Sequence, residues 1–154
     1  MSEYVSRVVW KRDNQNFLDN GFSRGHVWQF DGGAEVPASS SPQILPAPYS
    51  VPEGVDPEEA FVAALSSCHM LFFLAIAASR GFIVDAYTDN AVGVMEKDSD
   101  GNLAMTRVTL RPRVTFSGDN EPSMDQLERM HHRSHERCFL ANSVKTGVVT
   151  EIPA

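Results

Sequence analysis

The stretch from Phe61 to Ala78 reads FVAALSSCHMLFFLAIAA and is apolar at nearly every position. A helix that is apolar around its whole circumference is normally buried on all sides. The preceding DPEE supports a helix start, because Asp56 can cap, Pro57 suits the first helical position and acidic side chains favour the positive end of a helix. Gly81 is a typical stop. The sequence therefore predicts a long buried helix from Pro57 to Arg80.

The remaining segments predict an α+β protein with few connecting helices. Runs rich in β-branched and aromatic residues indicate strands at 4–10, 26–30, 82–96, 103–117 and 142–152, with 82–96 and 103–117 joined as a hairpin through KDSDGN. Valines and leucines of 103–117 alternate with Arg107, Arg111 and Arg113, which should face the other way. A second helix is expected from Ser123 to Phe139. The five prolines of 32–56 indicate a long functional loop.

The expected architecture is one domain, residues 1–154, with antiparallel sheets around the long buried helix and the second helix. A chain of 154 residues with two helices has difficulty covering one of them on every side, so we expect a homodimer. The stretch 60–78 also has the length of a membrane span, but its centre is interrupted by polar residues from Ser66 to His69. A core helix is therefore the favoured interpretation, and no membrane is expected as a partner.

The net charge of −7 argues against nucleic acid and against an anionic membrane surface, since both need a basic face. The first residues, MSEYVSRVVWKRDNQNF, alternate and carry charges, unlike a signal peptide. We therefore expect the protein in the cytoplasm, where thiols stay reduced.

Cys68 and Cys138 are the two cysteines of the chain, which are too few for a disulfide scaffold. A cysteine reacts as its thiolate, and apolar surroundings disfavour that form, so Cys68 needs a nearby cation to react. His69 is not expected to be this cation, because the side chains of neighbouring residues on a helix point about 100° apart. It is expected to be a hydrogen-bonded histidine of the core or an interface, and an arginine from the loop region is the natural cation.

Cys138 allows several interpretations. His131, His135 and Cys138 are spaced i, i+4, i+7 on one helix face and could bind zinc or copper, with Cys68 or His69 as fourth ligand. Alternatively, Cys138 pairs with Cys68 in a reversible disulfide. The histidines could also form an ordinary solvated helix face.

Each cysteine lies in a distinctive motif, Cys68 in VDPEEAFVAALSSC and Cys138 in SHERCFLANS. These motifs resemble the OsmC/Ohr family of thiol-dependent peroxidases: the first is similar to the segment that opens the helix of the reactive cysteine, and the second to the family's second cysteine motif. The order of elements agrees along nearly the whole chain. The resemblance implies an OsmC-like fold and an intertwined homodimer with two active sites at its interface.

The resemblance also implies roles. Cys68 matches the peroxidatic cysteine, which a hydroperoxide converts to a sulfenic acid, and Cys138 matches the resolving cysteine that forms a disulfide with it. Glu58 matches the family glutamate, and Arg24 is the best match for the arginine that stabilises the thiolate. Organic hydroperoxides are the implied substrates and small or lipoyl dithiols the implied reductants, with no cofactor and no metal.

Helix geometry adds one condition. Ten helical residues span about 15 Å, so a Glu58 close to a Cys68 must come from the other subunit. The chain departs from the family at Phe139, where proline is typical, and in the bulky HMLFFL after the first cysteine. These departures bear on substrate size and on disulfide formation, so weak activity is expected. The alternative is a non-catalytic relative that binds an apolar ligand, or senses oxidation, at the dimer interface.

Overall fold

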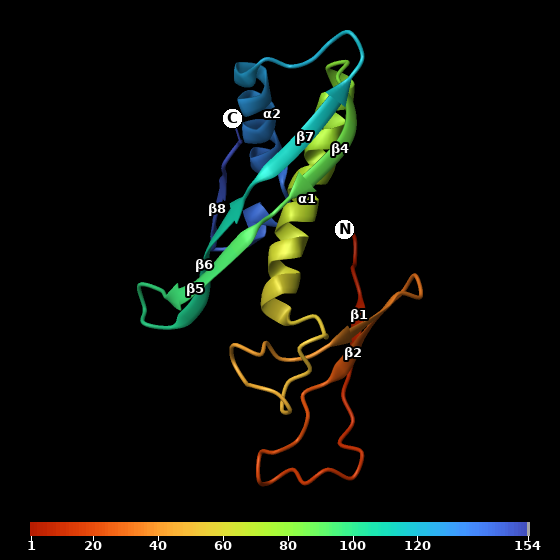
Figure 1. Ribbon diagram of the computed structural model, residues 1–154, viewed down its shortest axis with the longest axis vertical. Helices are drawn as coiled ribbons and strands as arrows, with labels where there is room; N and C mark the ends of the chain where they lie inside the picture. Colours follow the sequence, from red (N-terminus) through yellow and green to blue (C-terminus); the bar gives the residue numbers. More distant parts are fainter. Residues whose placement is uncertain (154) are drawn as a thin grey trace. The chain divides into compact units, whose positions relative to one another are not determined.

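The computed structural model describes residues 1–153, and the chain divides into two compact units, residues 1–60 and 61–154. The first unit contains an antiparallel sheet in the order β1 (Ser6–Val9), β2 (His26–Phe30) and β3 (Glu35–Ala38) (Figure 1). The first two strands confirm the prediction. The third lies inside the expected loop, and its Pro37 is tolerated because β3 is an edge strand.

Helix α1 (Pro57–Ser79) begins and ends where the sequence predicts, within one residue. Asp56 and Glu59 form a reciprocal cap, in which each side chain accepts a hydrogen bond from the other residue's backbone N–H, at 2.8 and 2.9 Å. At the other end Gly81 has φ +78°, and the Phe82 N–H reaches back to the Ala77 carbonyl at 3.0 Å. This is a Schellman ending, which glycine adopts without steric cost.

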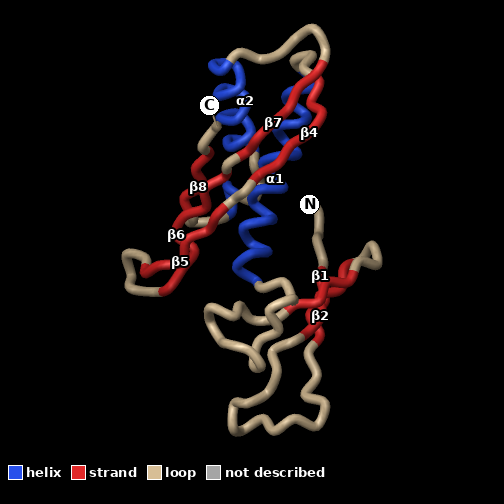
Figure 2. The backbone as a smooth tube through the Cα atoms, in the orientation of Figure 1, coloured by secondary structure: helices blue, strands red, loops and turns tan. Residues whose placement is uncertain are grey.

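The second unit confirms the predicted hairpin, but each arm is divided in two. β4 (Ile83–Asp89) pairs with β7 (Pro112–Ser117), and β5 (Val92–Lys97) pairs with β6 (Leu103–Leu110), both antiparallel. Figure 2 shows β4 and β5, and likewise β6 and β7, following one another along a bent ribbon. β8 (Gly147–Thr150) adds to β6 in parallel, which the expectation of antiparallel sheets did not include.

The second helix, α2 (Met124–Arg137), is capped by Ser123 as predicted, and a short 3₁₀ turn, Ala141–Ser143, follows it. Two apolar clusters form the core of this unit. One joins the second half of α1 to α2, β4 and β7, and is centred on Phe73 and Met130. The other joins the first half of α1 to β6 and β8 and is centred on Leu65 and Val108. Both halves of α1 thus pack against sheet.

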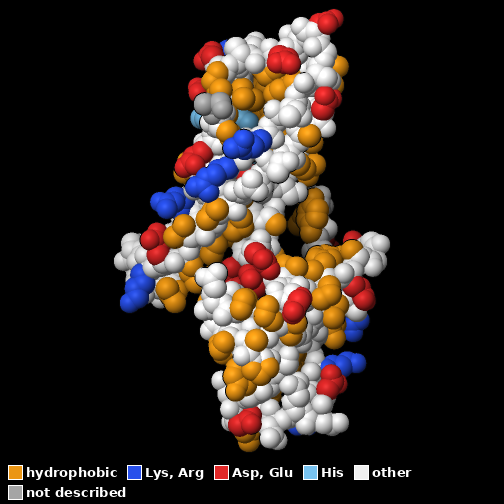
Figure 3. Space-filling model, viewed as in Figure 1, with side chains coloured by type: hydrophobic (Ala, Val, Ile, Leu, Met, Phe, Trp, Pro, Cys, Tyr) orange, Lys and Arg blue, Asp and Glu red, His pale blue; other side chains and the backbone are white. Residues whose placement is uncertain are grey.

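The three arginines along β6, β7 and the residue between them face solvent, as the sequence predicts. Arg107, Arg111 and Arg113 are exposed, while Val108 and Leu110 are fully buried. Figure 3 shows Lys and Arg side chains in blue along this ribbon. Arg111 pairs with Glu151 at 2.9 Å, beyond the end of β8. The ribbon therefore has a solvated outer face and an inner face that covers the helices.

The single chain does not bury α1 on every side, as the expected need for a second copy implies, and burial of the remaining stripe by a partner stays a prediction. One stripe is buried, and the opposite stripe is exposed and consists of small or apolar residues: Ala64, Ser67, Leu71, Ala75 and Ala78. By length and composition α1 could also cross a membrane, a test that core helices of soluble proteins pass as well. The exposed stripe is the part of α1 that the chain itself leaves uncovered.

Gly93 of β5 is a position where a side chain does not fit. A Cβ there would lie 2.6 Å from Val62 Cγ2 on α1 and in collision with the end of Met105. Met105 can move, but the β-branched Val62 is held in its rotamer. We expect Gly93→Ala to lower the free energy of unfolding by about 1–3 kcal/mol, measured by urea denaturation.

Gly147→Ala in β8 is the matched control, because its Cβ would lie 3.6 Å from the Thr106 carbonyl oxygen, an ordinary contact. Equal stability of the two variants would contradict the close packing of α1 on β5.

Candidate active site

The second unit brings the two cysteines together although 70 positions separate them in the sequence. Cys68 lies at the middle of α1 and is half-buried, and Cys138 is the C-cap of α2 and is 1% exposed. Both are free thiols. Burial raises the pKa of the Cys138 thiol, the neighbouring Cys68 raises it further, and the backbone N–H groups of Ala141 and Leu140 oppose both effects. The two thiols are therefore close enough for Cys68 to affect the ionisation of Cys138, and their pairing as a disulfide stays a prediction.

The chain after α2 turns sharply and holds Cys138 in place. The Ala141 N–H donates to Cys138 Sγ at 3.4 Å, and the Asn142 N–H donates to the Cys138 carbonyl at 3.0 Å. Phe139, where the family has proline, lays its ring edge-on against Phe72, with centroids 5.0 Å apart. Phe72 follows Cys68 by one helical turn, so this aromatic contact spans the same junction between α1 and the end of α2 as the two thiols do.

A buried pair of histidines joins α1 to α2, the two elements that carry the thiols. His69 Nε2 and His131 Nδ1 are 3.0 Å apart, and the planes of the two rings are nearly parallel, with 9° between them. Phe73 stacks on His131 at 4.3 Å between centroids. The prediction that His69 is a hydrogen-bonded core histidine is confirmed. The interpretation of the histidines as a solvated face is wrong for His131, which is 2% exposed.

Both imidazoles of this pair are neutral near pH 7. Burial lowers the pKa of His69 to about 4, assisted by the charge of His135 and opposed by that of Asp89. Burial likewise lowers the pKa of His131 to about 3, with His69 adding to the effect. A neutral pair can share one hydrogen bond, in which one ring donates and the other accepts. Their outer nitrogens, His69 Nδ1 and His131 Nε2, are buried without a hydrogen-bond partner among the described residues.

The zinc or copper interpretation finds no support in the geometry. Among residues 1–153, no three His, Cys, Asp or Glu side chains are placed to hold a metal ion together. One reason is visible at His131, whose Nδ1 is engaged by His69. His131, His135 and Cys138 share a helix face as the spacing predicts, but do not converge on one point.

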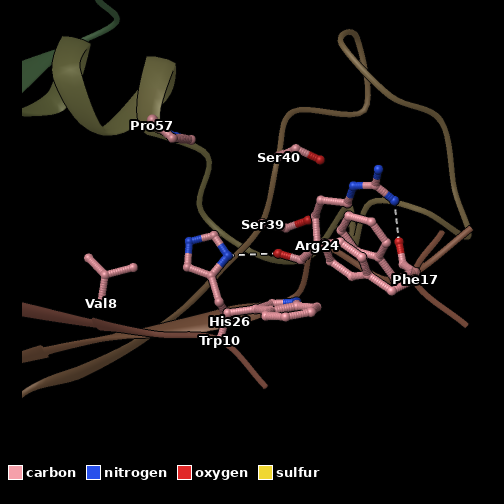
Figure 4. Close-up of a pocket in the computed structure, with 9 residues that line it drawn as sticks. Val8, Trp10, Phe17, Arg24, His26, Ser39, Ser40 and Pro57 are labelled. Carbon is pink, nitrogen blue, oxygen red and sulfur yellow. Dashed lines mark hydrogen bonds between the residues drawn. The ribbon is translucent and has the colours of Figure 1, made fainter. Parts of the chain in front are cut away.

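The first unit contains an apolar cavity of about 540 Å³. Three aromatic rings that pack on one another, those of Trp10, Phe17 and Phe22, form part of its wall. Figure 4 shows the labelled side chains that surround it. The complete lining is Val8, Trp10, Phe17, Phe22, Arg24, His26, Ser39, Ser40 and Pro57. The cavity therefore has an apolar wall with a single guanidinium in it.

Arg24 is held firmly at this wall. Its guanidinium lies over the Phe22 ring, 3.7 Å from the centroid, and donates to the Asn20 carbonyl and side-chain oxygens at 3.0 and 2.7 Å and to the Phe22 carbonyl. His26 accepts a hydrogen bond from Trp28 through Nε2 at 3.1 Å, so its Nδ1–H donates to the Arg24 carbonyl, at 2.7 Å (Figure 4). These contacts place a fixed positive charge beside apolar surface.

The four predicted site residues are divided between the units. Cys68 and Cys138 meet in the second unit, whereas Arg24 and Glu58 both belong to the first. One carboxylate oxygen of Glu58 is buried without a hydrogen-bond donor among the described residues. The roles of Arg24 and Glu58 at the thiolate stay predictions.

The pairing of His69 with His131 was not foreseen, and the sequence held a weak signal for it. His131 precedes Cys138 by seven residues, which returns a helix to nearly the same face. If Cys138 meets Cys68, His131 must lie along the same side of α2, towards α1.

Comparisons with known proteins show the family and the fold of the chain. A family model described as OsmC-like protein matches residues 50–152. An OsmC-like protein of unknown function from Vibrio cholerae is 58% identical, with a TM-score of 0.98 and coverage of 99% of this chain and 100% of that one. The comparison with curated proteins gave no match.

Two more distant structures share the fold. The organic hydroperoxide resistance protein OhrB of Bacillus subtilis is 18% identical, with a TM-score of 0.69 and coverage of 97% and 98% of the two chains. An organic hydroperoxide resistance protein from Legionella pneumophila is 11% identical, with a TM-score of 0.69 and coverage of 99% and 96%. At such identities the likeness concerns the fold alone.

Proposed function

The chain belongs to the OsmC-like family, and from that membership we propose that it is a cysteine-based peroxidase that reduces organic hydroperoxides with a dithiol. The observation that carries the proposal is the meeting of Cys68 and Cys138 as free thiols at the junction of α1 and the end of α2. A half-buried thiol beside a buried one suits a peroxidatic and a resolving cysteine, because the first must meet substrate and the second need not.

The reaction balances as follows. The Cys68 thiolate attacks the terminal oxygen of ROOH, the O–O bond breaks, and the alkoxide leaves and takes a proton to become ROH. Cys68 is now a sulfenic acid. The Cys138 thiolate attacks that sulfur and displaces hydroxide, which leaves as water once protonated. A dithiol then reduces the disulfide in two exchange steps, ending as its own cyclic disulfide.

Arg24 and Glu58 complete the site in this proposal. A permanently charged guanidinium near Cys68 would stabilise the thiolate, and a carboxylate would orient that guanidinium. The buried oxygen of Glu58, which has no hydrogen-bond partner among the described residues, supports a cationic partner from a second copy. Because α1 is continuous from Pro57 to Ser79, Glu58 and Cys68 of one chain are about 15 Å apart along the axis, and the glutamate near a given Cys68 is that of a second copy.

A homodimer is therefore part of the proposal, and the exposed stripe of α1 is its expected contact. We expect Leu71→Glu to convert the dimer to monomer, because Leu71 is 60% exposed in the chain and lies at the middle of that stripe. A charge buried there without a partner is costly. Light scattering coupled to size exclusion measures the change. Leu103→Glu is the control, since Leu103 is 70% exposed at the start of β6, and a wild-type mass for both variants would contradict the contact.

The test of the activity is turnover of cumene hydroperoxide by the wild-type protein with dihydrolipoamide, compared with hydrogen peroxide. The apolar side chains around Cys68 favour the bulkier peroxide, and we expect a preference of at least about tenfold in kcat/KM. Multiple turnovers that depend on both substrates support the proposal. The absence of turnover, with both thiols still reduced, would contradict it.

The apolar cavity of the first unit favours a second candidate function, the binding of an apolar ligand. Dodecanoate is a suitable probe because its chain fits an aromatic wall and its carboxylate suits Arg24. We expect it to quench Trp10 fluorescence in the wild type and in Trp28→Phe, and to have no such effect in Trp10→Phe. Quenching that persists in Trp10→Phe would place the ligand elsewhere.

A further inference from the structure

The two buried imidazoles and the two thiols occur on the same pair of segments. His69 follows Cys68 directly on α1, and His131 precedes Cys138 by seven residues, or about two turns, on α2. The hydrogen bond between the imidazoles at 3.0 Å therefore joins the segment that carries one thiol to the segment that carries the other. A rigid helix connects each imidazole to its cysteine.

A disulfide places narrow demands on such a junction. Its Cβ atoms must lie about 3.5–4.5 Å apart, and deviations store strain that makes the bond more easily reduced. Apolar packing alone lets facing helices slide and rotate, because dispersion contacts have little direction. A hydrogen bond between two buried planar rings has a preferred distance and angle. It fixes both the sliding and the rotation of α2 on α1.

Packing of the core does not by itself require the two histidines. Each imidazole leaves its outer nitrogen buried without a partner among the described residues, and unpaired buried polar atoms destabilise a fold. Two apolar side chains in their place would avoid this cost. Phe73 already packs against His131 and supplies the apolar contact of this region.

We propose that His69 and His131 are positioning residues for the Cys68–Cys138 redox pair, and that their hydrogen bond sets the stability of the disulfide. The inference rests on the proposed function only in taking the two cysteines as a redox pair. Neither imidazole is assigned contact with the peroxide.

The test uses glutathione, so that no peroxide chemistry is involved. One glutathione disulfide accepts two electrons from the protein dithiol, giving one Cys68–Cys138 disulfide and two glutathione thiols through a mixed disulfide. The equilibrium constant of this exchange at pH 7.5 measures how well the fold holds the two sulfurs at bonding geometry. It is read from the fraction of protein disulfide after acid quenching.

Two amide variants at position 69 have the same polar group but differ in side-chain length, so they test whether the hydrogen bond to His131 itself is needed. In His69→Gln the side-chain amide occupies the place of Nε2 and can still meet His131 Nδ1, whereas in His69→Asn it is one carbon too short. We expect the equilibrium constant to stay within about threefold of wild type for Gln and to fall at least about tenfold for Asn, a change of roughly 1.4 kcal/mol. His131→Leu, which removes the partner imidazole of the hydrogen bond, is expected to behave as His69→Asn does.

Phe82→Leu is the control for general destabilisation, because Phe82 is buried in the same cluster but packs on Phe116. It should lower stability and leave the equilibrium constant unchanged. Equal constants for Gln, Asn and wild type would overturn the inference, and so would a wild type that forms no intramolecular disulfide. The wild type could prove inactive as a peroxidase while the equilibrium constant is still kept in His69→Gln and lowered in His69→Asn. That result would contradict the peroxidase proposal and leave the positioning role supported.

Discussion

Replacing Cys68 by serine is expected to abolish hydroperoxide consumption, lowering turnover by about a thousandfold or more. A hydroxyl at that position is a far weaker nucleophile, because it remains protonated near pH 7 where a thiol ionises in part. The measurement is cumene hydroperoxide loss with dihydrolipoamide in excess. Turnover that survives in Cys68→Ser would exclude Cys68 as the nucleophile.

Cys138→Ser should behave differently and serves as the matched variant. Cys68 can still be oxidised once, so we expect one equivalent of hydroperoxide to be consumed and a sulfenic acid to accumulate. Dimedone labelling followed by mass spectrometry detects that species. Continued turnover at the wild-type rate would mean that the dithiol reduces Cys68 directly and that Cys138 is not the resolving residue.

The second large effect is a loss of stability in acid that comes from the histidine pair. His69 and His131 have pKa values of about 4 and about 3 in the folded protein, below the ordinary value of about 6.5 in an unfolded chain. The unfolded chain therefore takes up protons first as pH falls. The stabilisation from keeping both rings neutral is complete above pH 6.5 and is lost progressively towards pH 4 and 3.

At pH 5 each of the two imidazoles should lower the free energy of unfolding by about 2 kcal/mol, or about 4 kcal/mol for the pair. That is a large part of the stability of an ordinary domain. Urea denaturation at pH 7.5 and pH 5 measures the difference. The double variant His69→Gln/His131→Asn keeps amides where the two hydrogen-bonding nitrogens lie, but these amides do not titrate. Between pH 7.5 and pH 5 its free energy of unfolding should therefore fall by about 4 kcal/mol less than that of the wild type. An equal loss in both proteins would contradict the assignment.

Local sequence signals accounted for the elements. The ends of α1 follow from Asp56, Glu59 and Gly81, which act within one turn of their own positions. Ser123 likewise starts α2, where it forms a capping box with Gln126. β3 was missed because Pro37 and the neighbouring prolines resemble a loop, and only its place at the sheet edge makes proline acceptable there.

The motifs around Cys68 and Cys138 resemble those of a family, and this resemblance singled out the two cysteines as candidate site residues. The family match confirms the resemblance. The sequence by itself thus determined the helices, most of the strands and the identity of the two sulfurs, since caps, periodicity and short motifs are properties of neighbouring residues. Only the tertiary structure decided that His131 is buried against His69 and that one stripe of α1 is left exposed. Those features depend on which helix faces meet, and contacts between residues 62 positions apart have no local signature.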